Sequence, residues 1–166
     1  MFDLKTLSME AVPRALAKAE RYRLLNEPGE AESICLDALA AEPDNQDAIT
    51  MLLLALTDQF VEDFSRVPEA LNAIGRLRDA YDRAYYTGII HERRAKALLA
   101  HGTPRGSSRA YEWLRDAMEH YERAEAIRPP NNDDALLRWN ACARLIMHDR
   151  HLGPSREEPS EPLLSE

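Results

Sequence analysis

The sequence has few of the β-branched residues from which strands are usually built. It holds 3 valines and 7 isoleucines against 24 alanines and 22 leucines. Valine and isoleucine favour strands, whereas alanine and leucine are strong helix formers. No apolar run reaches the ~18 residues of a membrane span, and residues 1–9 lack the apolar stretch of a signal peptide. We therefore expect a cytoplasmic all-α protein with no membrane partner, long enough for one domain with its own core.

Cysteine is also scarce, and basic residues are outnumbered by acidic ones. Cys35 and Cys142 each lie inside a helical pattern, where a reduced thiol serves as a small apolar side chain. The chain has 21 basic and 29 acidic residues, which gives a net charge of −8. Phosphate backbones and anionic lipids repel such a protein, so the composition disfavours nucleic acid and membranes as partners.

Catalytic and metal-binding motifs are incomplete wherever they begin. The His-Glu pair at residues 91–92 starts like a zinc-protease motif, but Ala95 stands where the second histidine ligand is required. The loop at residues 101–108 contains glycines, yet it lacks the lysine of a phosphate-binding loop and follows a helix. We expect Ser107 or Ser108 to cap the helix after it. The sequence thus predicts no enzyme activity, no cofactor and no metal.

One helical pattern occurs twice, 86 positions apart (117 − 31). Small residues at helical spacing are followed by a proline and then by Asn and Asp residues, as expected where one packed helix ends and the next begins. Such an echo indicates a repeated helical unit, and a helical bundle with alanine at its interfaces is the alternative. The identical pairs are Ala31/Ala117, Ala38/Ala124, Ala40/Ala126, Pro43/Pro129, Asn45/Asn131 and Asp47/Asp133.

Prolines and glycines predict where the helices begin and end. Proline is tolerated in the first turn of a helix and stops a helix elsewhere, and Asn or Asp caps a new one. With no proline after the fourth helix, we place its end at Thr87-Gly88. The first expected helix begins at Met9 or Ala11 and ends at Leu25, and the others span residues 28–42, 46–61, 68–87, 89–100, 109–128 and 133–148.

These residues resemble the tetratricopeptide repeat family, whose repeats are antiparallel helix pairs. The resemblance implies an all-α solenoid of about three repeats over residues 1–150, closed by the capping helix 133–148. Residues 151–166, rich in Pro, Glu and Ser, are expected to form a disordered acidic tail. The matching positions are Ala19, Tyr22, Ala31, Cys35, Ala38 and Pro43 in the first repeat, Ile49, Leu52, Leu56, Ala70 and Ile74 in the second, and Ala95, Leu98, Ala117, Tyr121, Ala124 and Pro129 in the third.

The resemblance also implies a groove lined by the first helix of each pair. The partner-binding residues that we expect along it are Arg23, Arg93, Lys96, Arg138 and Arg144. This basic stripe suits a peptide or partner helix with acidic side chains. The alternative is a solvated helical face on which Glu92 and Lys96 form an i,i+4 pair.

The sequence as a whole predicts a non-catalytic protein–protein interaction module, a scaffold or adaptor. Two alternatives stay open: a secretion-type chaperone for an unstructured client, and a nucleic-acid accessory protein that uses the basic stripe. A second copy of the chain also stays open as a partner. A further hypothesis has the acidic tail fold back over the groove and mask it, against the simpler role of keeping the protein in solution.

Overall fold

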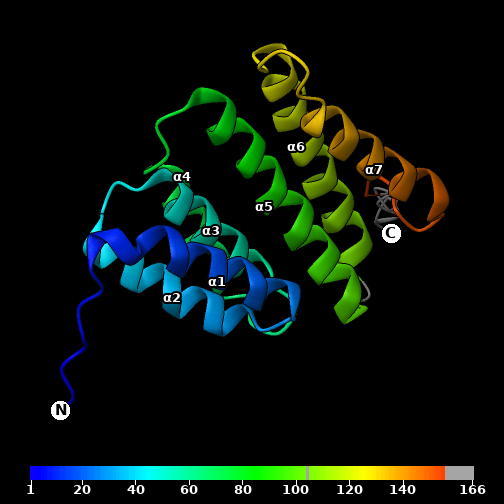
Figure 1. Ribbon diagram of the computed structural model, residues 1–166. Coiled ribbons are helices and arrows are strands. Elements are labelled where there is room, and N and C mark those ends of the chain that lie inside the picture. Colours follow the sequence, from blue (N-terminus) through cyan, green and yellow to red (C-terminus); the bar gives the residue numbers. More distant parts are fainter. Residues whose placement is uncertain (104, 156–166) are drawn as a thin grey trace, which may run out of the picture.

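The computed structural model describes residues 1–103 and 105–155, and over these ranges the chain is helical and forms no strand (Figure 1). This confirms the all-α prediction. Among the described residues, no helix is both long and apolar enough to span a membrane. A short 3-10 turn at Met9–Ala11 precedes the helices α1 (Val12–Leu24), α2 (Pro28–Ala41), α3 (Gln46–Thr57), α4 (Arg66–Ile74), α5 (Ala80–His101), α6 (Gly106–Ala126) and α7 (Asp134–His148).

Several helix ends follow directly from the local sequence. Pro28 occupies the first position of α2, where its missing N–H costs no hydrogen bond. The Asn45 side chain accepts a hydrogen bond from the amide of Ala48 at 2.9 Å and caps α3. Gly102 ends α5 in the left-handed conformation, with φ of 63°, which glycine adopts without steric cost. These ends were predictable because each depends on one residue.

The predicted break at Thr87-Gly88 is wrong. The fourth helix ends at Ile74, and after a turn α5 begins at Ala80 and runs through Gly88 to His101. Asp79 caps this start by accepting from an amide three residues on, at 3.0 Å. Gly88 is a point of close packing, since a Cβ there would lie 2.5 Å from Cε1 of Tyr121 in α6.

The predicted cap of the sixth helix is also wrong. Ser107 and Ser108 lie inside α6, which begins at Gly106. Arg105 occupies the N-cap position and makes no side-chain cap. Gly106 is closely packed at this point, since a Cβ there would lie 2.5 Å from Thr103 Oγ1.

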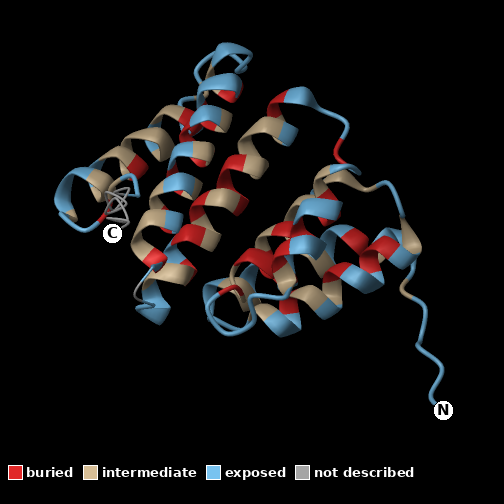
Figure 2. Cartoon of the chain, turned by 180° about the vertical axis from the view of Figure 1, so that it is seen from behind, coloured by how far each residue is buried: buried red, intermediate tan, exposed pale blue. Residues whose placement is uncertain are grey.

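Neighbouring helices pack as pairs along the chain. Each of α2, α3, α4, α6 and α7 contacts the helix before it, and α5 packs most extensively against α6. Contacts of α1 with α3 and of α3 with α5 bring these three helices together. In Figure 2 the buried residues lie on the facing sides of the helices. Alanines with no exposed surface, among them Ala19, Ala31 and Ala38, allow this close approach.

The buried residues form two clusters that meet at α5. The first unites α1–α4 and includes Ile90 and Ala97 of α5. The second unites α5–α7 and includes Tyr121, Cys142 and Leu152. Because Leu152 is buried, packing extends past the end of α7. The part of the predicted tail from residue 156 onward lies outside the described residues.

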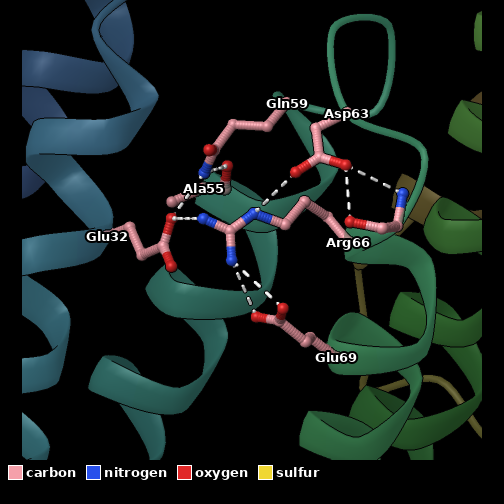
Figure 3. A network of polar contacts seen from close by, with 7 residues as sticks. Glu32, Ala55, Gln59, Asp63, Arg66 and Glu69 are labelled. Carbon is pink, nitrogen blue, oxygen red and sulfur yellow. Dashed lines mark hydrogen bonds and ion pairs between the residues drawn. The ribbon is translucent and has the colours of Figure 1, made fainter.

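A network around Arg66 joins α2 to the start of α4 (Figure 3). Its guanidinium donates to Glu32 of α2 at 3.0 Å and to both carboxylate oxygens of Glu69 at 3.1 and 3.0 Å. Asp63 lies 3.6 Å from its Nε. Gln59, which follows α3, donates to the same Glu32 at 2.7 Å. The turn between α3 and α4 is therefore held by hydrogen bonds to charged groups, which are stronger than neutral ones.

Gly88→Ala tests the close packing of α5 on α6. Alanine is the better helix former by about 1 kcal/mol, yet its methyl group would overlap the buried Tyr121 ring. We expect the overlap to prevail and the free energy of unfolding to fall by about 1–3 kcal/mol, measured by urea denaturation. Gly29→Ala is the matched control, because a Cβ at Gly29 meets nothing within 4 Å. Equal effects of both substitutions would contradict the packing role.

Candidate partner-binding pocket

A surface pocket of about 390 Å³ opens where the C-terminal ends of α1 and α3 meet the later turns of α5. The apolar side chains of the pocket lie at its base and at its edge. Phe60 and Ala97 are buried beneath the pocket, with 1% and 0% of their surface exposed. Leu24 and Val61 stand at its edge, 83% and 49% exposed. Such exposed side chains beside an apolar base can accept an apolar group from another molecule.

Asp58 joins the three helices that form the pocket. It follows the last residue of α3, and its carboxylate accepts from Arg23 of α1 through Nε at 2.6 Å and Nη2 at 3.3 Å. Arg93 of α5 donates to the same carboxylate, and also to Thr57 Oγ1 at 3.1 Å. Asp58 is not among the residues expected from the sequence, since its role depends on two residues 35 positions away on either side.

Glu92 is the acid of a second polar cluster, between α5, α6 and α7. No part of its surface is exposed, yet it accepts hydrogen bonds from Lys96 Nζ at 2.5 Å, Tyr121 Oη at 2.6 Å and Arg138 Nη1 at 3.4 Å. Burial alone would raise the pKa of Glu92, but the bonds from Lys96 and Tyr121 and the nearby positive charges outweigh it and hold the pKa below its usual value. Glu92 is therefore ionised and ties α7 to α5.

The five predicted binding residues do not form one stripe. Arg23, Arg93 and Lys96 line the pocket. Arg138 is directed to Glu92, and Arg144 is exposed six residues further along α7, about 120° around the helix at 3.6 residues per turn. Four of these cations share two carboxylates, so less positive charge is free than the sequence suggests. The i,i+4 pair of Glu92 and Lys96 that we weighed as the alternative is present.

Aromatic and basic side chains form another cluster on α5 and α6. The rings of His91 and His120 stack at a centroid distance of 5.3 Å. Arg94 lies 4.3 Å over the ring of Trp113, which in turn stacks on Phe64 from the turn after α3 at 5.8 Å. Burial, with the charge of Arg94 and the neighbouring His120, lowers the pKa of His91 to about 4. The stacked imidazole rings of this cluster are therefore neutral at neutral pH.

Neither cysteine is placed for chemistry. Cys35 and Cys142 are both buried, and burial raises the pKa of each thiol to about 12. At neutral pH both stay protonated, whereas nucleophilic attack and metal binding need the thiolate. Within the described ranges, no group of three or more His, Cys, Asp or Glu side chains is arranged to hold a metal ion.

Comparisons with protein-family models, with curated proteins and with solved structures found no match for this chain. The features of the molecule that bear on function are the pocket, the two carboxylates that hold its cations, and the exposed apolar side chains at its edge.

Glu92→Gln tests the cluster between α5, α6 and α7. Glutamine keeps the shape but loses the charge that holds Lys96 and Arg138, so we expect the free energy of unfolding at pH 7 to fall by about 1–3 kcal/mol. Because the folded pKa of Glu92 lies below its ordinary value of 4.5, its stabilising contribution exists above that pH and is lost as pH falls through the folded pKa. The difference in the free energy of unfolding between the variant and wild type should therefore be smaller in acid.

Urea denaturation at pH 7 and at pH 3.5 measures this difference. Glu119→Gln is the control, since Glu119 is an exposed acid paired with Arg123 at 3.9 Å on the surface of α6. Equal, small effects of the two substitutions would contradict a structural role for the buried carboxylate.

His91→Leu tests the stacked histidines. The folded pKa of about 4 lies below the ordinary 6.5, so the folded state resists protonation that the unfolded state accepts. The contribution of the neutral His91 ring to the free energy of unfolding should be fully present above pH 6.5 and should fall as pH is lowered toward 4. His91→Leu removes this dependence from one ring, so its melting temperature should drop less between pH 7 and pH 5. His148→Leu, which removes an exposed histidine outside the stacked pair, is the control. An unchanged drop in His91→Leu would refute the assignment.

Proposed function

We propose that this chain is a non-catalytic interaction module that binds a segment of a partner protein in the pocket between α1, α3 and α5. The observation that carries the proposal is the convergence of apolar and cationic side chains from three helices in one open pocket. Asp58 holds two of these helices to the third before any partner arrives. A pre-organised surface of this kind loses less conformational freedom on binding.

We also propose that the helix pairs belong to a tetratricopeptide-like solenoid. In this arrangement α1/α2, α3/α4 and α5/α6 are the repeats, and α7 is the capping helix. Support comes from the packing within each pair and from the contacts that link α1 to α3 and α3 to α5. These contacts place the first helices of the three pairs beside one another, which is where the pocket opens.

The chemistry of the pocket favours binding over catalysis. Its lining contains no histidine, cysteine or serine. Of the charged groups in the lining, Arg23 and Arg93 are bonded to Asp58 and Lys96 is bonded to Glu92, so these groups are not free to transfer protons. The buried, unpaired thiols elsewhere suit a reducing compartment, and we assign the module to the cytoplasm as a scaffold or adaptor. A chaperone for an unstructured client would use the same pocket.

A nucleic-acid role has less support. Binding to a phosphate backbone requires a set of free cations, each of which neutralises one phosphate. Here Arg23, Arg93, Lys96 and Arg138 are bound to Asp58 and Glu92. The chain as a whole carries a net charge of −8.

Substitution of the exposed apolar edge tests the binding proposal. The double variant Leu24→Asp/Val61→Asp places two charges on exposed positions, so the fold is retained while the apolar contact is lost. Tagged protein is used to capture partners from the cells that express it, and captured proteins are quantified by mass spectrometry. Proteins that bind wild type should be depleted at least tenfold with the double variant, which corresponds to about 1.4 kcal/mol.

The matched control is Leu36→Asp/Leu137→Asp, at positions 52% and 61% exposed on α2 and α7. It adds the same charge away from the pocket. Partners retained by the control and lost from the pocket variant support the proposal. Partners lost only from the control, or from neither, contradict it.

A further inference from the structure

The cations that line the pocket are already bonded to acids. Arg23 and Arg93 both donate to the carboxylate of Asp58. Lys96 donates from Nζ to Glu92 at 2.5 Å. An anion that entered the pocket would have to compete with these two carboxylates for the same N–H donors. The three cations of the lining therefore give little attraction to an acidic ligand.

Other carboxylates at the edge of the pocket are exposed. Glu20 of α1 is part of the lining. Glu27 directly follows Asn26, which is also part of the lining. Glu62 in the same way follows Val61. Among the residues that the structure describes, none of these three glutamates belongs to an ion pair. The charges that this edge can offer to a ligand are therefore negative.

These carboxylates lie next to the exposed apolar side chains. Glu20 and Leu24 are four residues apart on α1, so their side chains lie one turn apart on the same face of the helix. Val61 and Glu62 are consecutive. A large apolar side chain that enters the pocket past Leu24 and Val61 thus brings the residues beside it close to carboxylates.

The charge of the whole chain acts in the same direction. The sequence has 29 acidic and 21 basic residues, and its net charge of −8 attracts basic molecules and repels acidic ones. A segment that is only basic would leave the apolar base at Phe60 and Ala97 without a contact, and one that is only apolar would leave the carboxylates without a partner. The segment that suits both parts of the pocket is therefore both apolar and basic.

We propose that the pocket between α1, α3 and α5 binds a basic amphipathic segment of a partner protein. The large apolar side chains of the segment enter the pocket, and its lysines or arginines face Glu20, Glu27 and Glu62. The inference rests on the proposed function, since it names the chemistry of the partner at the same pocket. Each exposed ion pair changes the affinity by about 1.4- to fivefold. The apolar contact therefore supplies most of the affinity, and the carboxylates select which segment binds.

NMR titration of the full chain with blocked peptides tests the proposal. Three peptides share a central pair of leucines and carry lysines, serines or glutamates on both sides, and a fourth keeps the lysines but has serines in place of the leucines. Binding should shift the amide signals of Leu24, Val61 and Ala97. The reference signals are those of Leu36 and Asn72, which line a different pocket between α2 and α4.

The order of affinities carries the result. At about 0.01 M salt the lysine–leucine peptide should bind at least about fivefold more tightly than the serine–leucine peptide, and the glutamate–leucine peptide should bind most weakly of the three. Raising the salt to about 0.15 M shortens the Debye length from about 30 Å to about 8 Å, so these differences should become smaller. The peptide without leucines should not shift the signals of the pocket, because it makes no apolar contact.

A triple variant with a matched control assigns the preference to the edge of the pocket. Glu20→Gln/Glu27→Gln/Glu62→Gln should bring the affinities of the lysine–leucine and serine–leucine peptides to within about twofold of each other, with that of the serine–leucine peptide unchanged. The control removes the same charge from exposed acids outside the lining and should keep the preference. Its substitutions are Asp3→Asn, Glu10→Gln and Asp37→Asn.

Several outcomes would overturn the inference. They are tighter binding of the glutamate–leucine peptide, equal affinities of the three leucine peptides, a lysine preference that survives the triple variant or is lost equally in the control, and no shift at the pocket with any peptide.

The two proposals fail in different ways. If the three leucine peptides bind the pocket equally while captured partners still depend on Leu24 and Val61, the pocket binds partners and their basic character is wrong. If the lysine preference is found while capture is unaffected by Leu24→Asp/Val61→Asp, the pocket has this chemistry but no partner uses it, and the function that we propose is wrong.

Discussion

The arrangement around the pocket depends on one carboxylate that two arginines share. Asp58 directly follows α3, and its carboxylate accepts from Arg23 of α1 and from Arg93 of α5. Without it, two half-buried guanidiniums would face each other across the pocket with like charge. With it, three helices from distant parts of the chain are held by hydrogen bonds to charged groups, which are the stronger kind. This contact holds together the three helices that line the pocket.

The second carboxylate, Glu92, has the corresponding role on the other side of α5. It is fully buried and ionised, so the free energy of burying its charge must be offset by its three donors. Those donors come from α5, α6 and α7. Arg93 and Glu92 are consecutive residues, so α5 directs a cation toward the first hydrophobic cluster and an anion toward the second. The position of α5 is thereby determined from both sides.

The sequence predicts the fold well where one residue decides the outcome. Pro28 and Asn45 mark helix starts because a missing N–H and a capping amide act locally. Gly88 misled the prediction, since a glycine inside a helix has the same local signature whether it breaks the helix or makes room for a ring. The contact with Tyr121 spans 33 positions (121 − 88) and has no local signal. Gly75 followed by the capping Asp79 was the signal for the earlier helix end.

In the candidate site, too, some features could be predicted from the sequence, and those that depend on packing could not. The resemblance to the repeat family placed Arg23, Arg93 and Lys96 along one groove, and these three side chains line one pocket. The resemblance gave no indication of Asp58, and it placed Arg138 and Arg144 in the same set although they lie on different faces of α7. The charge of a surface depends on which acids reach it from other helices, and that depends on packing. The residues of a site are therefore easier to predict than its net charge.

Photo-crosslinking within cells tests whether the pocket between α1, α3 and α5 is the surface that meets a partner. A photoreactive amino acid replaces Val61 at the edge of the pocket or, in a second strain, Leu36 on α2; both positions are about half exposed. Our account predicts partner adducts from position 61 and none from position 36. Adducts from position 36 alone would contradict it.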